Sequence, residues 1–93
     1  MEIKMKAVIT VTGKDSVGII ADVSAVCSQY NANIVEITQS VLSEYFAMIM
    51  LTDISALNIK FADFADKLAA LGQSKCLDIR AMHEDIFNSM HRI

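Results

Sequence analysis

Residues that could bind an anion gather near the N-terminus, in the stretch TGKDSVGII. It holds two of the three glycines of the chain, Gly13 and Gly18, with Lys14, Asp15 and Ser16 between them. A phosphate-binding P-loop needs GxxxxGK followed by Ser or Thr, because its backbone amides and its hydroxyl hold the phosphates and Mg²⁺. Asp15 stands where that hydroxyl should be, and no glycine lies five positions before Gly13. The sequence therefore argues against nucleotide binding here.

The same stretch can also begin a helix, whose free N–H groups attract anions, including carboxylates. Asp15 or Ser16 is expected to cap this helix, because a short side-chain oxygen accepts hydrogen bonds from the first turn. Gly18 is then expected one turn into the helix, although glycine there costs about 0.5–1 kcal/mol relative to alanine. Its missing side chain would allow close approach by a ligand or by another backbone. These residues alone leave both alternatives open.

The other residues with chemical potential lie apart in the sequence. Cys27 and Cys76 form no CxxC pair, so both are expected to be packing residues. In the tail, His83 and His91 lack the HExxH spacing of a zinc site, and the two acidic residues after His83 suit a solvated turn or a helix start. No cysteine has a histidine beside it in sequence. We therefore expect no metal, no cofactor and no catalytic site.

Composition limits the possible partners. The chain has 93 residues, a formal net charge of −3 and 54% hydrophobic residues. This length predicts one domain spanning residues 1–93, and the negative charge argues against nucleic-acid binding. The longest apolar run, YFAMIML, is far shorter than the roughly 20 residues that cross a membrane, and MEIKMK lacks a signal-peptide core. We expect a cytoplasmic protein whose excess apolar residues form a homodimer face.

Hydrophobic periodicity predicts the order βαββαβ, followed by a tail that adds a short helix. The first helix is expected to end at Asn31–Asn33, and the second to run from a cap at Asn58 to a terminating Gly72. The predicted strands are residues 4–12, 34–42, 46–53 and 76–83. This order predicts an α+β fold, a ferredoxin-like sandwich with a four-stranded antiparallel sheet and two helices on one face.

Alternation along the strands predicts which residues face the helices. The expected helix-facing residues are Met5, Ala7, Ile9, Val11, Ala47, Ile49, Leu51, Leu77, Ile79 and Ala81. The opposite face would carry Val8, Phe46, Met48, Met50 and Met82. Such an apolar cluster should not face water, so it predicts a self-association interface with adaptable methionines. The alternatives are an error of parity and a cover formed by the tail.

Longer stretches resemble a known family. ITVTGKDSVGIIADVSAVCSQYNANIVEITQS resembles the first half of an ACT domain, with an acidic residue and then a glycine in the loop, and Asn-Ile opening the second strand. Here these residues are Asp15, Gly18 and Asn33–Ile34. FAMIMLTD resembles the third strand, and HEDIFNSMHRI resembles the tail of a small UPF0237-like group of stand-alone ACT proteins of uncharacterised function. The resemblance covers essentially the whole chain.

The resemblance implies a ferredoxin-like unit that pairs edge to edge or face to face and binds an amino acid or similar metabolite at the interface. It places the ligand around the loop after the first strand and the start of the second strand. On this chain those positions are Gly13, Lys14, Asp15, Ser16, Val17, Gly18, Ile19, Asn33 and Ile34. Backbone N–H groups near Val17 to Ile19 would hold a carboxylate, and Asp15 or Asn33 an amine. Some members carry a histidine or asparagine where this loop has Gly13 and Asp15.

Two functions follow. The first is a non-catalytic regulatory sensor, a homodimer that binds an amino acid or similar metabolite and acts on a separately encoded enzyme or regulator. The alternative is a pure dimerisation or protein-docking module without a small-molecule ligand.

Overall fold

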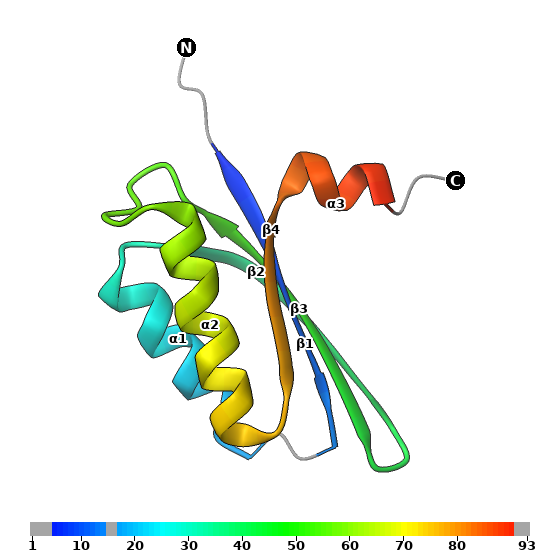
Figure 1. The fold of residues 1–93 in the computed structure, drawn as a ribbon. Coiled ribbons are helices and arrows are strands. Elements are labelled where there is room, and N and C mark those ends of the chain that lie inside the picture. The colour runs from blue at the N-terminus through cyan, green and yellow to red at the C-terminus, as the bar shows by residue number, and fades with distance from the viewer. Residues whose placement is uncertain (1–4, 15–16, 91–93) are drawn as a thin grey trace.

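The computed structural model describes residues 5–14 and 17–90. In chain order, the elements are β1 (Lys6–Gly13), α1 (Ile19–Gln29), β2 (Asn33–Leu42), β3 (Tyr45–Asp53), α2 (Phe61–Lys75), β4 (Asp78–His83) and α3 (Glu84–Met90). The strands form one antiparallel sheet in the order β2-β3-β1-β4. α1 and α2 cover one face, while α3 lies on the other side of the sheet (Figure 1). The ferredoxin-like prediction is confirmed, with β1 and β3 central.

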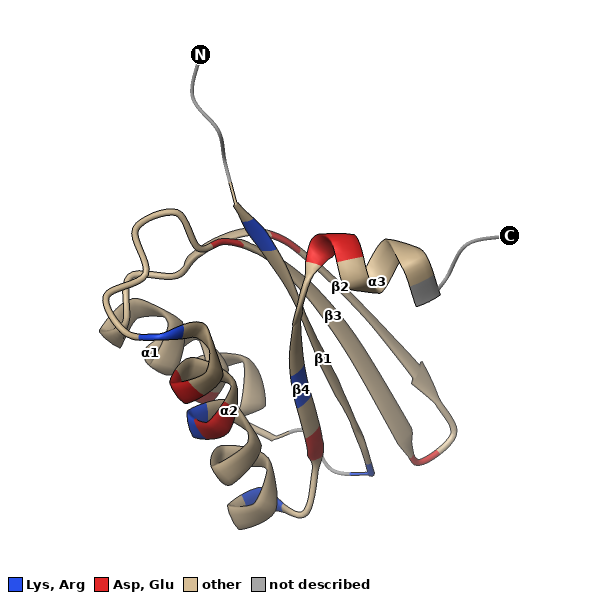
Figure 2. Cartoon of the chain, turned by 45° about the horizontal axis from the view of Figure 1, so that its top comes forward, with Lys and Arg blue, Asp and Glu red and all other residues tan. Residues whose placement is uncertain are grey.

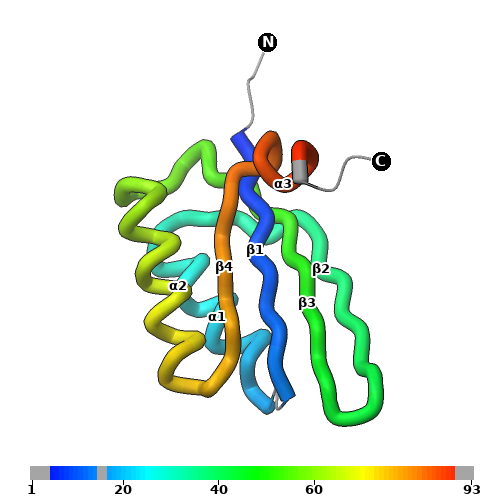
Figure 3. Tube along the Cα trace, turned by 45° about the vertical axis from the view of Figure 1, so that its right-hand side comes forward, coloured from blue at the N-terminus to red at the C-terminus, as the bar shows by residue number. Residues whose placement is uncertain are grey.

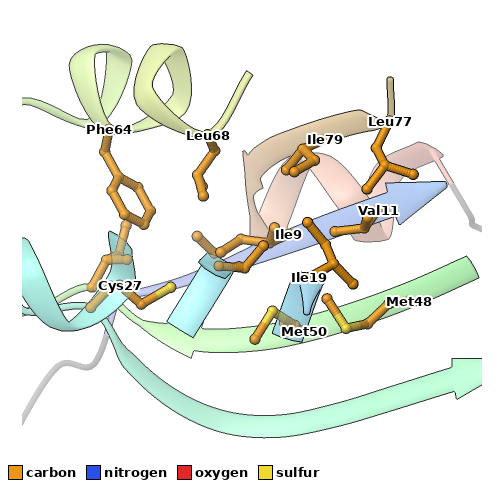
Figure 4. Close-up of a cluster of buried hydrophobic side chains, with 14 of the residues drawn as sticks. Ile9, Val11, Ile19, Cys27, Met48, Met50, Phe64, Leu68, Leu77 and Ile79 are labelled. Atoms are coloured by element: carbon orange, nitrogen blue, oxygen red, sulfur yellow. The ribbon is translucent and has the colours of Figure 1, made fainter. Parts of the chain in front are cut away.

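The core lies between the sheet and the two long helices (Figure 4). β1 contributes Ile9 and Val11, which lie on the helix-facing side as the sequence predicts. The helices contribute one buried stripe each. In α1 the stripe is Ile19, Val23 and Cys27; in α2 it is Phe64, Leu68 and Gly72.

The register of β3 shows that its two faces are the reverse of those predicted. Met50 lies opposite Ile9, and Met48 lies opposite Val11. Directly opposed residues share a face of the sheet, so both methionines point toward the helices, where Figure 4 shows them packed. Phe46 lies two residues before Met48 and shares this face. The prediction that Phe46, Met48 and Met50 form an exposed interface is therefore wrong.

The face of the sheet away from α1 and α2 is here called the open face. It carries the β3 residues that were expected to point toward the helices. These are Ala47, Ile49 and Leu51, opposite Thr12, Thr10 and Val8 of β1. Periodicity could not settle the parity of β3, because this strand is apolar on both faces.

Val8 and Met82 lie opposite each other on the open face, as predicted. They do not form an exposed surface, because Val8 is buried and Met82 is half-buried. α3 contacts β1 and β4 and lies on this side of the sheet (Figure 1). The tail therefore covers the end of the open face around Val8, which is one of the alternatives that the sequence leaves open.

The ends of α2 differ from the predicted ends. Its N-cap is Lys60, while Asn58 donates from Nδ2 to the carbonyl oxygen of Gln29 at 3.4 Å and thus holds the end of α1. The helix continues past Gly72 to Lys75, and Cys76 ends it in the left-handed conformation, with φ 58°. An added Cβ on Gly72 would lie 2.6 Å from the carbonyl oxygen of Leu77. Gly72 therefore allows β4 to pack closely against α2 and does not cap the helix.

Candidate functional site

The loop between β1 and α1 carries most of the predicted ligand residues. Gly13 ends β1, and Lys14 and Val17 are exposed. Asp15 and Ser16, predicted as caps and ligand residues, lie outside the described residues. Ile19 begins α1, and its side chain is buried in the core (Figure 4), so only its backbone could face a ligand.

Gly18 has a role that differs from the predicted one. It is the N-cap of α1 and not a residue one turn inside the helix, and its φ of 74° lies in the left-handed region. Nothing lies within 4 Å of a Cβ built on it. Within the described chain, Gly18 is therefore needed for its backbone angle, which L residues rarely adopt, and not for close packing.

The second predicted half of the site lies far from the first. Asn33 pairs with Asp53 at one end of β3, whereas Gly13 pairs with Phe46 at the other end. The span from residue 46 to residue 53 of an extended strand is roughly 23 Å. Ile34 is opposite Thr52, half-buried toward the helices. One chain therefore does not bring Asn33 and Ile34 to the β1–α1 loop.

A shallow groove of about 560 Å³ lies where β1 meets the β2–β3 hairpin. It is lined by Thr12, Gly13, Lys14, Ser40, Leu42, Tyr45, Phe46 and Ala47, and is here called the hairpin groove. Thr12, Ala47 and Ser40 lie opposite one another on three adjacent strands. Because this row alternates with the core row of Val11 and Met48, it belongs to the open face.

Among the described residues that line the hairpin groove, Lys14 is the charged one. Its Nζ lies 4.0 Å from Oε1 of Glu44 and 5.8 Å from the centre of the Tyr45 ring. Both charged side chains are more than half exposed, and an exposed ion pair contributes only about 0–1 kcal/mol. Little free energy therefore opposes transfer of the ammonium group of Lys14 from Glu44 to an anion in the groove.

β2 forms one outer edge of the sheet, on the side away from α2 (Figure 3). Four of its five large apolar residues, Val35, Ile37, Val41 and Leu42, are exposed, and Leu42 reaches 75%. β2 and β3 are largely without charge between their ends (Figure 2), and Glu36 is the charged residue of β2. A register shift between Ile34 and Glu36 makes Val35 a bulge.

β4 forms the other edge and differs in length and charge. It is six residues long, against ten for β2. Two of its exposed residues, Asp78 and Arg80, form an ion pair of 3.2 Å. Natural sheets protect their edges with short strands, charge and proline, so the β4 edge is protected and the β2 edge is largely bare.

The remaining candidates for chemistry give no active centre in the described chain. Burial raises the pKa of the Cys27 thiol from 9.0 to about 11, so this thiol stays protonated near neutral pH. Cys76 is exposed. His83 stacks on Phe61, with ring centres 4.2 Å apart. Residues 5–14 and 17–90 hold no group of three or more His, Cys, Asp or Glu side chains arranged for a metal ion; His91 lies outside them.

Sequence reasoning named Gly13 and Lys14 but missed the rest of the hairpin groove. Ser40, Leu42, Tyr45 and Ala47 are distant from the β1–α1 loop in the sequence and reach it only through the pairing of β1 with β3. One available signal was the exposed pair Leu42 and Tyr45 around a two-residue turn, because apolar residues there need a reason.

Known proteins resemble this chain over nearly its whole length. A family model described as ACT domain matches residues 6–81. A UPF0237 protein of Clostridium perfringens is 49% identical over 89 residues, covering 96% of this chain and 100% of that protein. A UPF0237 protein of Methanopyrus kandleri is 40% identical over 88 residues, covering 95% and 98%.

Among solved structures, an ACT domain protein from Streptococcus pneumoniae matches with a TM-score of 0.78 and 38% identity. The match covers 91% of this chain and 96% of that one. None of the helices in the described part of this chain is long and apolar enough to span a membrane.

Proposed function

Because this chain belongs to the ACT domain family, we propose that it is a single regulatory ACT domain, residues 1–93, without catalytic activity. It forms a homodimer and binds an amino acid or similar small metabolite beside the β1–α1 loop. ACT domains are typically regulatory and ligand-binding. The observation that carries the proposal is the outer edge of β2, which is long, apolar and largely without charge.

This edge favours pairing with a second copy. Backbone N–H and C=O groups on an outer edge are ready to pair with another strand, and the exposed apolar side chains of β2 would leave water on pairing. Pairing of like edges about a two-fold axis makes the two β2 strands antiparallel. Two sheets of four strands would then form one continuous sheet.

Such a pair also brings the two halves of the predicted ligand site to the same end of the sheet. Reversing the second β2 strand places its Asn33 end beside Leu42 of the first copy. Leu42 lines the hairpin groove together with Gly13 and Lys14. The ligand residues that one chain holds at opposite ends of the sheet would thus lie at the same end of the paired sheet, with β3 of one copy between Leu42 and Gly13. Backbone N–H groups at the start of α1 are the proposed partners of a ligand carboxylate.

Sedimentation equilibrium of the wild type and of charged edge variants tests the dimer. Wild type is expected to be a dimer and Val41→Lys a monomer, since Val41 is 69% exposed on β2 and would carry a charge into the pair. Ile86→Lys is the matched control, because Ile86 is comparably exposed but lies on α3. A monomeric wild type, or a Val41→Lys variant that stays dimeric, would refute this arrangement.

A thermal-shift screen of the wild type against the twenty amino acids and nucleotides tests the sensor. A ligand that binds only the folded state stabilises it by about 2.7 kcal/mol when its concentration is 100 times its Kd. We expect at least one amino acid or related metabolite to raise the Tm. A dimer whose Tm no compound raises would instead support the pure association module.

A further inference from the structure

The outer edge of β2 is interrupted at both ends. At one end, the bulge at Val35 breaks the regular ladder with β3. At the other end, the strand stops at Leu42, and Ser43 follows in the left-handed conformation with φ 57°. Residues 36–42 therefore form the regular part of the edge that a second strand can follow.

The pairing with β3 assigns the side chains of this segment to the two faces of the sheet. Those on the helix side, opposite buried residues of β3, are Ile37, Gln39 and Val41. Those on the open face are Glu36, Thr38, Ser40 and Leu42. The helix-side residues are nevertheless exposed, Ile37 by 38% and Val41 by 69%. On that side the edge therefore presents an amide between two apolar side chains.

Two-fold symmetry restricts how two such strands can pair. In a continuous antiparallel sheet the axis is perpendicular to the sheet, so each face of one copy continues into the same face of the other. Directly opposite residues share a face, and therefore one residue must lie opposite itself on the axis. An axis at Gln39 pairs every residue from 36 to 42. An axis at Thr38 or Ser40 leaves one end of this segment without a partner inside it.

The axis at Gln39 also matches the side chains by chemistry. In that register Ile37 lies opposite Val41 of the second copy, and Thr38 lies opposite Ser40. An axis at Thr38 would instead set Ile37 opposite Gln39. An axis at Ser40 would set Gln39 opposite Val41. Each of these alternatives places the amide against an apolar side chain, and a buried amide without a hydrogen-bond partner is costly.

We propose that β2 pairs with β2 of a second copy in this one register, and that Gln39 selects it. The two Gln39 amides lie across the axis, where each can donate to and accept from the other. An Ile37–Val41 pair flanks them on either side. A single polar pair within an apolar seam fixes register and partner, because other alignments leave it unsatisfied. This inference rests on the proposed homodimer and adds the geometry of its interface.

Disulfide formation between single-cysteine variants of the full chain maps the register. Gln39→Cys, Thr38→Cys and Ser40→Cys are each made with Cys76→Ser, because Cys76 is exposed whereas Cys27 is buried. Directly opposite residues have Cβ atoms about 4.5–5.5 Å apart and diagonal ones are farther apart, while a disulfide needs about 3.5–4.5 Å. Gln39→Cys is therefore expected to cross-link at least about tenfold faster than the other two variants under the same oxidant.

The other outcomes of this experiment are distinct. Faster cross-linking of Thr38→Cys or Ser40→Cys would overturn the register while the dimer through β2 stands. If none of the three variants cross-links, pairing through β2 is wrong, and sedimentation equilibrium then shows whether the protein is a dimer at all.

Charge exchange tests whether Gln39 lies opposite itself. Gln39→Glu and Gln39→Lys each set two like charges across the axis, and each is expected to raise the Kd of the dimer about tenfold or more. An equimolar mixture of the two variants pairs opposite charges and should recover most of the affinity. Gln73→Glu is the matched control, because Gln73 is exposed on α2, which packs against β4. A mixture that dimerises no more tightly than the separate variants would refute the position of Gln39 on the axis.

Discussion

Neighbouring residues of β3 provide a sharp test of the fold, because Met50 is 0% and Ile49 is 44% exposed. Truncating a buried methionine to alanine removes its transfer free energy and leaves a cavity, at a cost of about 2–5 kcal/mol. The side chain of Ile49 is still 44% exposed, so folding removes only about half of it from water. Its truncation leaves no closed cavity. Full burial of an apolar side chain contributes about 1.5–3 kcal/mol, so Ile49→Ala should cost about 1 kcal/mol.

Urea denaturation of Met50→Ala, Ile49→Ala and wild type at one protein concentration measures this difference. The free energy of unfolding of Met50→Ala should be lower than that of Ile49→Ala by about 2 kcal/mol, or about 10 °C in Tm for a domain of this size. Equal free energies of unfolding for the two variants would mean that the open face is as deeply buried as the core. A larger loss for Ile49→Ala would restore the opposite parity for β3 and refute the described register.

Three further predictions concern backbone and thiols. Gly72→Ala should lower the free energy of unfolding by about 1–3 kcal/mol in urea melts, because the new Cβ would meet the backbone oxygen of Leu77; a neutral result would mean that β4 can move away easily. Gly18→Ala should also lower the free energy of unfolding by about 1–3 kcal/mol, because alanine would be strained at the left-handed φ of this position. Any loss of ligand binding in this variant must therefore be compared with its loss of Tm. An unchanged Tm would contradict the left-handed conformation. The Cys27 thiol has a pKa of about 11 in the folded state and 9.0 in the unfolded state. Between these two pH values the unfolded chain loses the thiol proton and the folded chain keeps it, which favours unfolding. The free energy of unfolding therefore has its full value, as far as Cys27 is concerned, below pH 9. That contribution is lost as the pH rises toward 11, by up to about 2–3 kcal/mol; Cys27→Val should flatten this fall, and iodoacetamide at pH 8 should label Cys76 before Cys27.

Much of the fold follows from the sequence where the two faces of an element differ. β1 and β4 alternate clearly, because Thr10 and Arg80 mark the face away from the helices. β3 has no such marker, so its parity depends on pairing with β1, which periodicity alone does not contain. The bulge at Val35 has the same cause, because an extra residue in a strand shows only against its partner.

The ends of helices were harder to predict, because glycine has two uses. Gly18 and Gly72 both lie near a helix end in the sequence, yet one supplies a left-handed φ and the other allows close packing of α2 against β4. Sequence alone could not distinguish these uses, since neither the φ angle nor the neighbour across space is visible in it. The candidate site was partly predictable for the same reason: Lys14 stands in a recognisable loop, while Ala47 joins it only through strand order.

The inequality of the two sheet edges has a consequence for how far assembly can grow. A sheet with two bare edges can add copies without limit and become a ribbon or fibre. Here the pairing of β2 with β2 would use the one bare edge of each copy and leave the charged β4 edges outermost. Growth would then stop at two chains, so the short charged β4 strand would set the size of the assembly without taking part in its interface.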